Sequence, residues 1–98
     1  MEKRAEILKV INYFIELEIS DKSNYTPLIN EESLIGDSGI DSFDFIMVFL
    51  KVGEVYGIDD KLFKEKIGGS NPSVKTIIDF LEEHQSVYKT FDEVTQGV

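Results

Sequence analysis

Gly36-Asp37-Ser38-Gly39-Ile40-Asp41-Ser42-Phe43 is followed, after Asp44, by the apolar run Phe45-Ile46-Met47-Val48-Phe49-Leu50, and this stretch decides the fold. The turn-forming residues end at Asp41, and after it the apolar residues recur at the spacing of a helix. The pattern predicts a helix with Asp41 as its N-cap that runs to about Tyr56, just before Gly57. Ser42 then lies at the helix start, where backbone N–H groups have no intrahelical acceptor and the helix dipole is positive. A phosphate esterified to Ser42 would be favoured there.

This predicted helix carries two stripes of side chains. The predicted core stripe consists of Phe45, Ile46, Phe49, Val52, Gly53 and Tyr56. A second stripe consists of Phe43, Met47, Leu50 and Glu54. Because a small bundle cannot easily bury both faces, we expect Met47 and Leu50 to be exposed beside Ser42 and to contact partner proteins. The alternative is that the first loop covers both residues as part of the core.

The flanking segments are also predicted to be helical. Unbroken helical spacing predicts a first helix over residues 4–19, and turn-forming residues predict a long irregular connection over residues 20–40. A short helix is expected at Asp60–Ile67, and a last helix from about Asn71-Pro72-Ser73 to His84, capped by either Asn71 or Ser73. The residues expected to pin the first loop to the core are Tyr25, Leu28, Leu34 and Ile35.

These elements predict an all-α fold of three long helices and one short helix, with a long first loop. Residues 1–85 form the predicted domain. Residues 86–98 are polar with isolated apolar side chains, so they are expected to be a C-terminal extension that is either a frayed helix or disordered.

The composition excludes several classes of function. A chain of 98 residues is one domain without room for a large catalytic cleft. Ten basic and nineteen acidic residues give a net charge of −9, which disfavours nucleic acids and anionic membranes as ligands and favours basic partner surfaces. No apolar run is long enough to span a bilayer, and the charged N-terminal residues do not resemble a secretory signal, so a cytoplasmic protein is expected.

The same residues allow other interpretations, most of which fail on the sequence. Gly36-Asp37-Ser38 resembles a hydrolase nucleophile motif, but the chain lacks the matching late Asp and His and the length for an α/β sheet. A calcium loop would need glycine where Ser42 stands and an acid where Val48 stands. With no histidine in the motif, Ser42 is predicted to be an acceptor, not a self-activated nucleophile. Because the chain contains no cysteine, any thioester chemistry needs an imported thiol.

Order and spacing together resemble the acyl carrier proteins over about residues 5–84. Leu34 and Ile35 fall where that family keeps apolar loop anchors, and Asp37 and Gly39 match its residues before the site. Asp41-Ser42-Phe43 falls on the attachment motif, and Ser73-Val74 with Ile78-Asp79-Phe80-Leu81 resembles the final helix. Three departures are Ser38, where leucine is usual, and Met47 and Gly53, where members of fatty-acid synthesis often have acids. They suggest a free-standing carrier of a specialised pathway.

The resemblance implies a non-catalytic, monomeric four-helix bundle of acyl-carrier type that binds no metal ion. A phosphopantetheinyl transferase would attach phosphopantetheine from coenzyme A to Ser42, with Asp41 serving as motif residue and helix cap. An acyl-activating ligase or acyltransferase, a ketosynthase or other acyl-processing enzymes would then be the partners, without nucleic acid or stable membrane insertion. The alternative is a helical adaptor without a prosthetic group. The acidic residue at position 44 is explained equally well by a role in capping the helix as by a role in attracting the transferase. The candidate partner-binding residues are Asp37, Phe43, Asp44, Ile46, Met47, Leu50 and Glu54.

Overall fold

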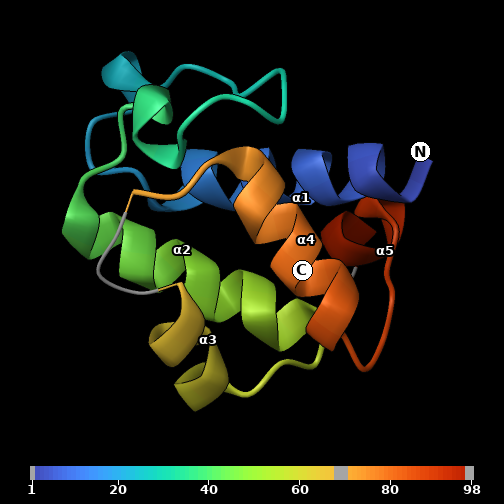
Figure 1. Ribbon diagram of the computed structural model, residues 1–98. Helices are drawn as coiled ribbons and strands as arrows, with labels where there is room; N and C mark the ends of the chain where they lie inside the picture. The colour runs from blue at the N-terminus through green and yellow to red at the C-terminus, as the bar shows by residue number, and fades with distance from the viewer. Residues whose placement is uncertain (1, 68–70, 97–98) are drawn as a thin grey trace.

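The computed structural model describes residues 2–67 and 71–96, and Figure 1 shows their arrangement. Helix α2, at Ser42–Val55, begins where the sequence predicts, because the Asp41 carboxylate accepts the backbone N–H of Asp44 at 2.7 Å. Tyr56 is its C-cap. Gly57 follows with a φ of 67°, a left-handed conformation that favours glycine. The predicted start and end of this helix are therefore confirmed.

Four further α-helices complete the described structure. They are α1 at Glu2–Glu18, α3 at Asp60–Lys66, α4 at Val74–His84 and α5 at Phe91–Gln96, with short 3₁₀ turns at Lys22–Asn24 (η1) and Ile35–Ser38 (η2). Within the described residues no strand forms, apart from an isolated bridge between Leu34 and Ser73. The predicted all-α class is confirmed, and α5 is added to it. The radius of gyration is 12.2 Å, close to the roughly 13 Å of a compact chain of this length.

The buried face of α2 is rotated relative to the predicted core stripe. Phe49, Val52, Gly53 and Tyr56 are buried as expected, whereas Ile46 is 48% exposed and Val48 is fully buried. Two polar contacts to the end of α1 show which side of α2 is buried. Asp44 bonds Ser20, and Lys51 forms an ion pair with Glu18, so the side of α2 that carries residues 44, 48 and 51 faces α1. The prediction that Ile46 is a core residue is wrong for this reason.

The C-terminal segment packs against the rest of the domain in the described residues. The Ser86 and Val87 N–H groups donate to the Tyr56 carbonyl, and α5 packs on α1 beside the N-terminal end of the chain (Figure 1). Val94 is buried, and the Glu6 carboxylate accepts the Phe91 N–H at 2.9 Å, which lowers the pKa of that carboxyl. Of the two expectations for residues 86–98, a frayed helix or a disordered tail, the structure has a helix, α5, which packs on α1; residues 97 and 98 lie outside the described range.

The first loop is fastened to the segment that leads into α4. The Ile35 N–H donates to the Pro72 carbonyl at 2.9 Å, and the Val74 N–H donates to the Ser33 carbonyl at 2.8 Å. Leu28 and Ile35 are buried as predicted, and Tyr25 is half-buried. Leu34 is 42% exposed and forms the isolated bridge with Ser73, so its predicted role as a core anchor is wrong.

The two candidate caps of α4 have different roles. Ser73 is the N-cap, with its hydroxyl oxygen accepting the Thr76 N–H at 3.2 Å. The Asn71 carboxamide oxygen instead accepts the Gly36 N–H at 2.9 Å. Asn71 thus holds the loop before α2, and Ser73 starts α4.

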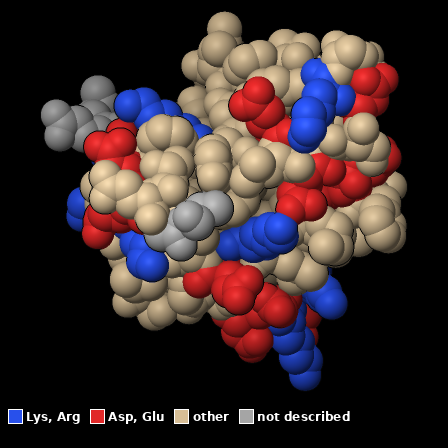
Figure 2. Space-filling model, turned by 180° about the vertical axis from the view of Figure 1, so that it is seen from behind, with Lys and Arg blue, Asp and Glu red and all other residues tan. Residues whose placement is uncertain are grey.

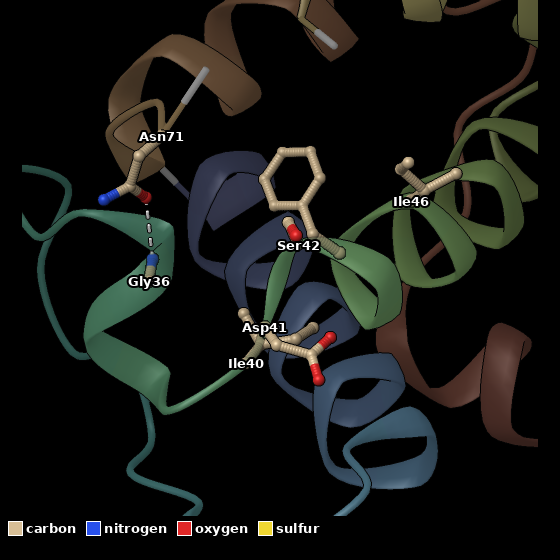
Figure 3. Close-up of a pocket in the computed structure, with 7 residues that line it drawn as sticks. Gly36, Ile40, Asp41, Ser42, Ile46 and Asn71 are labelled. Carbon is tan, nitrogen blue, oxygen red and sulfur yellow. Dashed lines mark hydrogen bonds between the residues drawn. The ribbon is translucent and has the colours of Figure 1, made fainter. Parts of the chain in front are cut away.

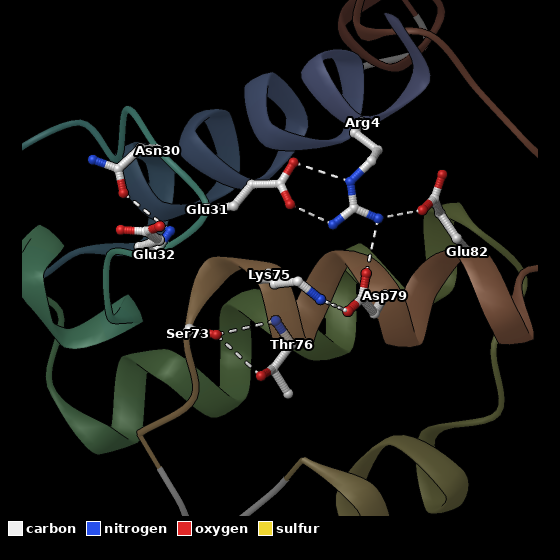
Figure 4. A network of polar contacts seen from close by, with 9 residues as sticks. All are labelled: Arg4, Asn30, Glu31, Glu32, Ser73, Lys75, Thr76, Asp79 and Glu82. Carbon is white, nitrogen blue, oxygen red and sulfur yellow. Dashed lines mark hydrogen bonds and ion pairs between the residues drawn. The ribbon is translucent and has the colours of Figure 1, made fainter. Parts of the chain in front are cut away.

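Charged side chains of both signs share the molecular surface. Figure 2, a view from behind, shows Lys and Arg side chains among the Asp and Glu side chains. One cation, Arg4 on α1, binds Glu31 of the first loop and both Asp79 and Glu82 of α4 (Figure 4). Arg4 lowers the pKa of the Glu31 carboxyl, whereas Lys75 and then Arg4 lower the pKa of the Asp79 carboxyl. The network therefore joins three segments through charge.

Replacing Arg4 by methionine should reduce the free energy of unfolding near pH 7 by about 1 kcal/mol, the scale of exposed ion pairs. A carboxyl with a lowered folded-state pKa stabilises the fold above its unfolded pKa, and loses that contribution as the pH falls through its folded pKa. The difference between wild type and Arg4→Met should hence shrink below about pH 4.5, the ordinary value of Glu31. Denaturant unfolding of both proteins near pH 7 and below about pH 4.5 measures this difference. Lys64→Met on α3 is the charge-matched control. A pH-independent difference would refute the ionic explanation.

None of the helices in the described part of the chain is both long and apolar enough to cross a membrane.

Candidate functional site

Ser42 is exposed at the first position of α2. The first bond of the helix is from the Phe45 N–H to the Asp41 carbonyl, at 2.9 Å. Because the N–H groups of Ser42 and Phe43 precede that bond, they have no acceptor within the helix. A hydroxyl at this position therefore lies beside partial positive charge and open solvent.

A hollow of about 450 Å³ lies next to Ser42. Ser42 and Ile46 of α2 lie on one side of it, and Gly36 and Asn71, joined by their hydrogen bond, lie on the other (Figure 3). The remaining lining residues are Ile40, Asp41 and Phe45. The hollow is thus largely apolar, with polar groups at its edge, and it is open to a group attached to Ser42.

Ser38, the neighbouring serine, has a different environment. Its side chain is fully buried, and its hydroxyl donates to the Ile35 carbonyl at 2.8 Å within η2. This bond explains how a polar residue can occupy a buried loop position. Gly39 then turns the chain toward α2 with a φ of 92°, and a Cβ there would lie 2.3 Å from the Asn24 carbonyl oxygen. The loop therefore buries Ser38 and presents Ser42.

The three aspartates near Ser42 are not equivalent. Asp41 and Asp37 are exposed, and their carboxylates accept the N–H groups of Asp44 and Leu34 respectively. Asp44 is only 7% exposed, because its carboxylate accepts both the N–H and the hydroxyl of Ser20, at 3.0 and 2.8 Å. The structure thus leaves two aspartates accessible beside the serine and turns the third toward α1.

The exposed side of α2 carries three large apolar side chains, which we call the apolar face: Phe43, Ile46 and Met47. They are 73%, 48% and 40% exposed. The expected exposure of Met47 is confirmed, whereas Leu50 is only half-buried and Glu54 is exposed further along the helix. The apolar face begins one residue after Ser42 and borders the hollow through Ile46.

Three residues at or next to the site, namely Ser20, Asn71 and Ile40, were not predicted from the sequence to take part in it. Ser20 carries no signal of its partner, because its contact with Asp44 depends on how α1 and α2 pack. Asn71 was considered only as a helix cap, and its bond to Gly36 depends on the loop pairing with the lead into α4. Ile40, which lines the hollow, could have been found as the apolar residue immediately before the helix cap.

The geometry suits a covalently attached phosphodiester at Ser42, because an accessible hydroxyl, unpaired helix N–H groups and adjacent open volume lie together. Comparisons with family models, curated proteins and solved structures yielded no match for the chain.

Proposed function

We propose that the protein is an acyl carrier protein with the four-helix bundle of that family formed by α1 to α4, and that Ser42 is its attachment residue. The observation that carries the proposal is the exposed Ser42 hydroxyl at the start of α2, beside a hollow of about 450 Å³. The sequence resemblance supports it independently, since Asp41-Ser42-Phe43 falls on the family motif. Phosphopantetheine would supply the thiol that holds a carboxylic acid as a thioester, which this chain without cysteine cannot provide itself.

The chain's own residues have defined tasks in this proposal. Asp41 caps α2 and thereby fixes Ser42 at the first helical position. The Ser42 oxygen would form the new bond to phosphorus while the pyrophosphate bond of coenzyme A breaks, releasing adenosine 3′,5′-bisphosphate. No histidine lies near the motif in sequence, so the transferase would accept the hydroxyl proton. The N–H groups of Ser42 and Phe43 would then face the attached phosphate.

The apolar face is the proposed docking surface for the transferase and for acyl-processing enzymes. Exposed apolar side chains that lie together commonly mark binding surfaces. Asp37, Asp41 and Glu54 are exposed and acidic, so a partner with an apolar centre and basic edges would complement this side of α2. The cargo could be any carboxylic acid that such enzymes activate.

Intact mass spectrometry after incubation with coenzyme A and a broad-specificity transferase tests the function. The proposal requires one phosphopantetheinyl group per chain. A chain that remains unmodified, while a known carrier in the same reaction is modified, would favour the alternative of a helical adaptor without a prosthetic group.

The rate of this modification should fall as salt is added. A net charge of −9 attracts a basic enzyme over long range, and added ions screen that attraction beyond about 10 Å at 0.1 M. Initial rates measured between low and moderate salt, with the transferase acting on a short serine peptide of low charge as control, separate screening from inhibition of the enzyme. A rate that does not depend on salt would contradict electrostatic steering.

A further inference from the structure

The first turn of α2 is fastened to the end of α1 through Asp44. One oxygen of its carboxylate accepts the Ser20 N–H at 3.0 Å and the Ser20 hydroxyl at 2.8 Å. The Asp44 N–H in turn donates to the Asp41 carboxylate at 2.7 Å. A continuous set of hydrogen bonds therefore runs from the N-cap of α2, through Asp44, to Ser20, two residues beyond the end of α1.

This arrangement leaves Asp44 little surface for a partner protein. Only 7% of the residue is exposed, and one of its carboxylate oxygens already accepts both hydrogen bonds from Ser20. A transferase side chain would have to displace Ser20 in order to bind that oxygen. The accessible charges beside Ser42 belong to Asp37 and Asp41 instead.

The contact has a mechanical consequence for Ser42, which lies in the same helical turn. Lys51 and Glu18 form a second link between α1 and α2, two turns further along the same side of α2. The Asp44 link holds the first turn of α2, and the position of that turn decides where the Ser42 hydroxyl points. The Ser20 link is the one nearest to the serine in sequence.

We propose that Asp44 is a positioning residue, which orients Ser42 for modification through its bonds to Ser20 and is not itself contacted by the transferase. This inference rests on the proposed modification of Ser42. According to this proposal, the Asp44 side chain must accept hydrogen bonds from Ser20. Its negative charge is not required.

Three variants distinguish positioning from direct contact. Asp44→Asn keeps a carbonyl oxygen that can accept from Ser20, so its kcat and KM with the transferase should stay within about twofold of wild type. Asp44→Ala removes the acceptor and should lower kcat about fivefold to tenfold with little change in KM, as expected for loss of a coupled contact. Ser20→Ala removes the hydroxyl bond and should lower kcat in the same direction. Adding Ser20→Ala to Asp44→Ala should have no further effect.

A direct ionic contact gives the opposite pattern. In that case Asp44→Asn would raise KM as much as Asp44→Ala does, and Ser20→Ala would behave as wild type. Either result would overturn the proposal. Glu65→Ala, which removes an exposed carboxylate from α3, is the control for a change of net charge.

Amide hydrogen exchange provides a readout that does not depend on modification. The Ser20 N–H should exchange slowly in wild type and in Asp44→Asn, and at least tenfold faster in Asp44→Ala. If the wild type is never modified, the proposed function fails, while this exchange pattern still decides whether Asp44 holds Ser20. Equal Ser20 exchange in all three proteins would refute the positioning role, whatever the transferase does.

Discussion

Ser42→Ala should abolish the phosphopantetheinyl adduct completely, while wild type gains one group per chain. The substitution removes the only oxygen that the proposal uses as acceptor. It leaves the Asp41 cap in place, and alanine is favourable at a helical position, so the fold should change in stability by no more than about 0.5 kcal/mol. Intact mass after incubation with coenzyme A and transferase measures the adduct, and circular dichroism checks the fold.

Ser38→Ala is the matched control, because it removes a hydroxyl four residues away from a buried position. This variant should still gain the adduct. It should also lose about 1 kcal/mol of stability, since the Ser38 hydroxyl donates to the Ile35 carbonyl. An adduct on Ser42→Ala, or its loss on Ser38→Ala with the fold intact, would show that Ser42 is not the attachment residue.

Sequence reasoning predicted best where the signal was local. The start of α2 could be predicted because turn residues end at a capping aspartate, and its end because a glycine follows Tyr56. Capping and turn preferences depend on a few neighbouring residues, and the structure satisfies them with bonds of the expected kind.

The face that α2 buries was harder to predict, because it depends on packing between helices. Phe45 to Leu50 is apolar at every position, so hydrophobic spacing alone does not determine the rotation of the helix. In the structure, the side of α2 that buries Val48 faces the end of α1, and Asp44 and Lys51 on that side bond to it. Ile46 consequently lies outside the core, and Val48 lies inside it.

The packing of the C-terminal segment was not predicted, for a related reason. Its apolar residues are few, so the sequence left a frayed helix and a disordered tail as alternatives and indicated no packing on α1. Along α1, Glu6, Val10 and Tyr13 share a second side: Glu6 bonds the Phe91 N–H, and Tyr13 packs edge-on against the Phe91 ring. Val10, fully buried, lies between them in the helix. This packing can be recognised only when the second side of α1 and the few apolar residues of α5 are considered together.

The second large prediction is that the apolar face of α2 docks the transferase, and the observed rotation of α2 decides which residue tests it best. Met47 is the better probe than Leu50, because it is 40% exposed whereas Leu50 is half-buried. Met47→Glu and Met47→Gln should each slow modification of Ser42 at least about tenfold, as expected when a well-packed apolar contact is lost from an interface. The uncharged glutamine variant separates the loss of apolar contact from the effect of added negative charge.

The melting temperature decides between docking and folding as the cause. A charged side chain at an exposed position should leave it nearly unchanged, whereas a carboxylate forced into the core would unfold the domain. Ile29→Glu is the matched control, because Ile29 is 82% exposed in the first loop and undergoes the same chemical change. If Met47→Glu is modified as fast as Ile29→Glu, the apolar face does not dock the transferase. If Met47→Glu unfolds, Met47 supports the core, and its exposure has no role in binding.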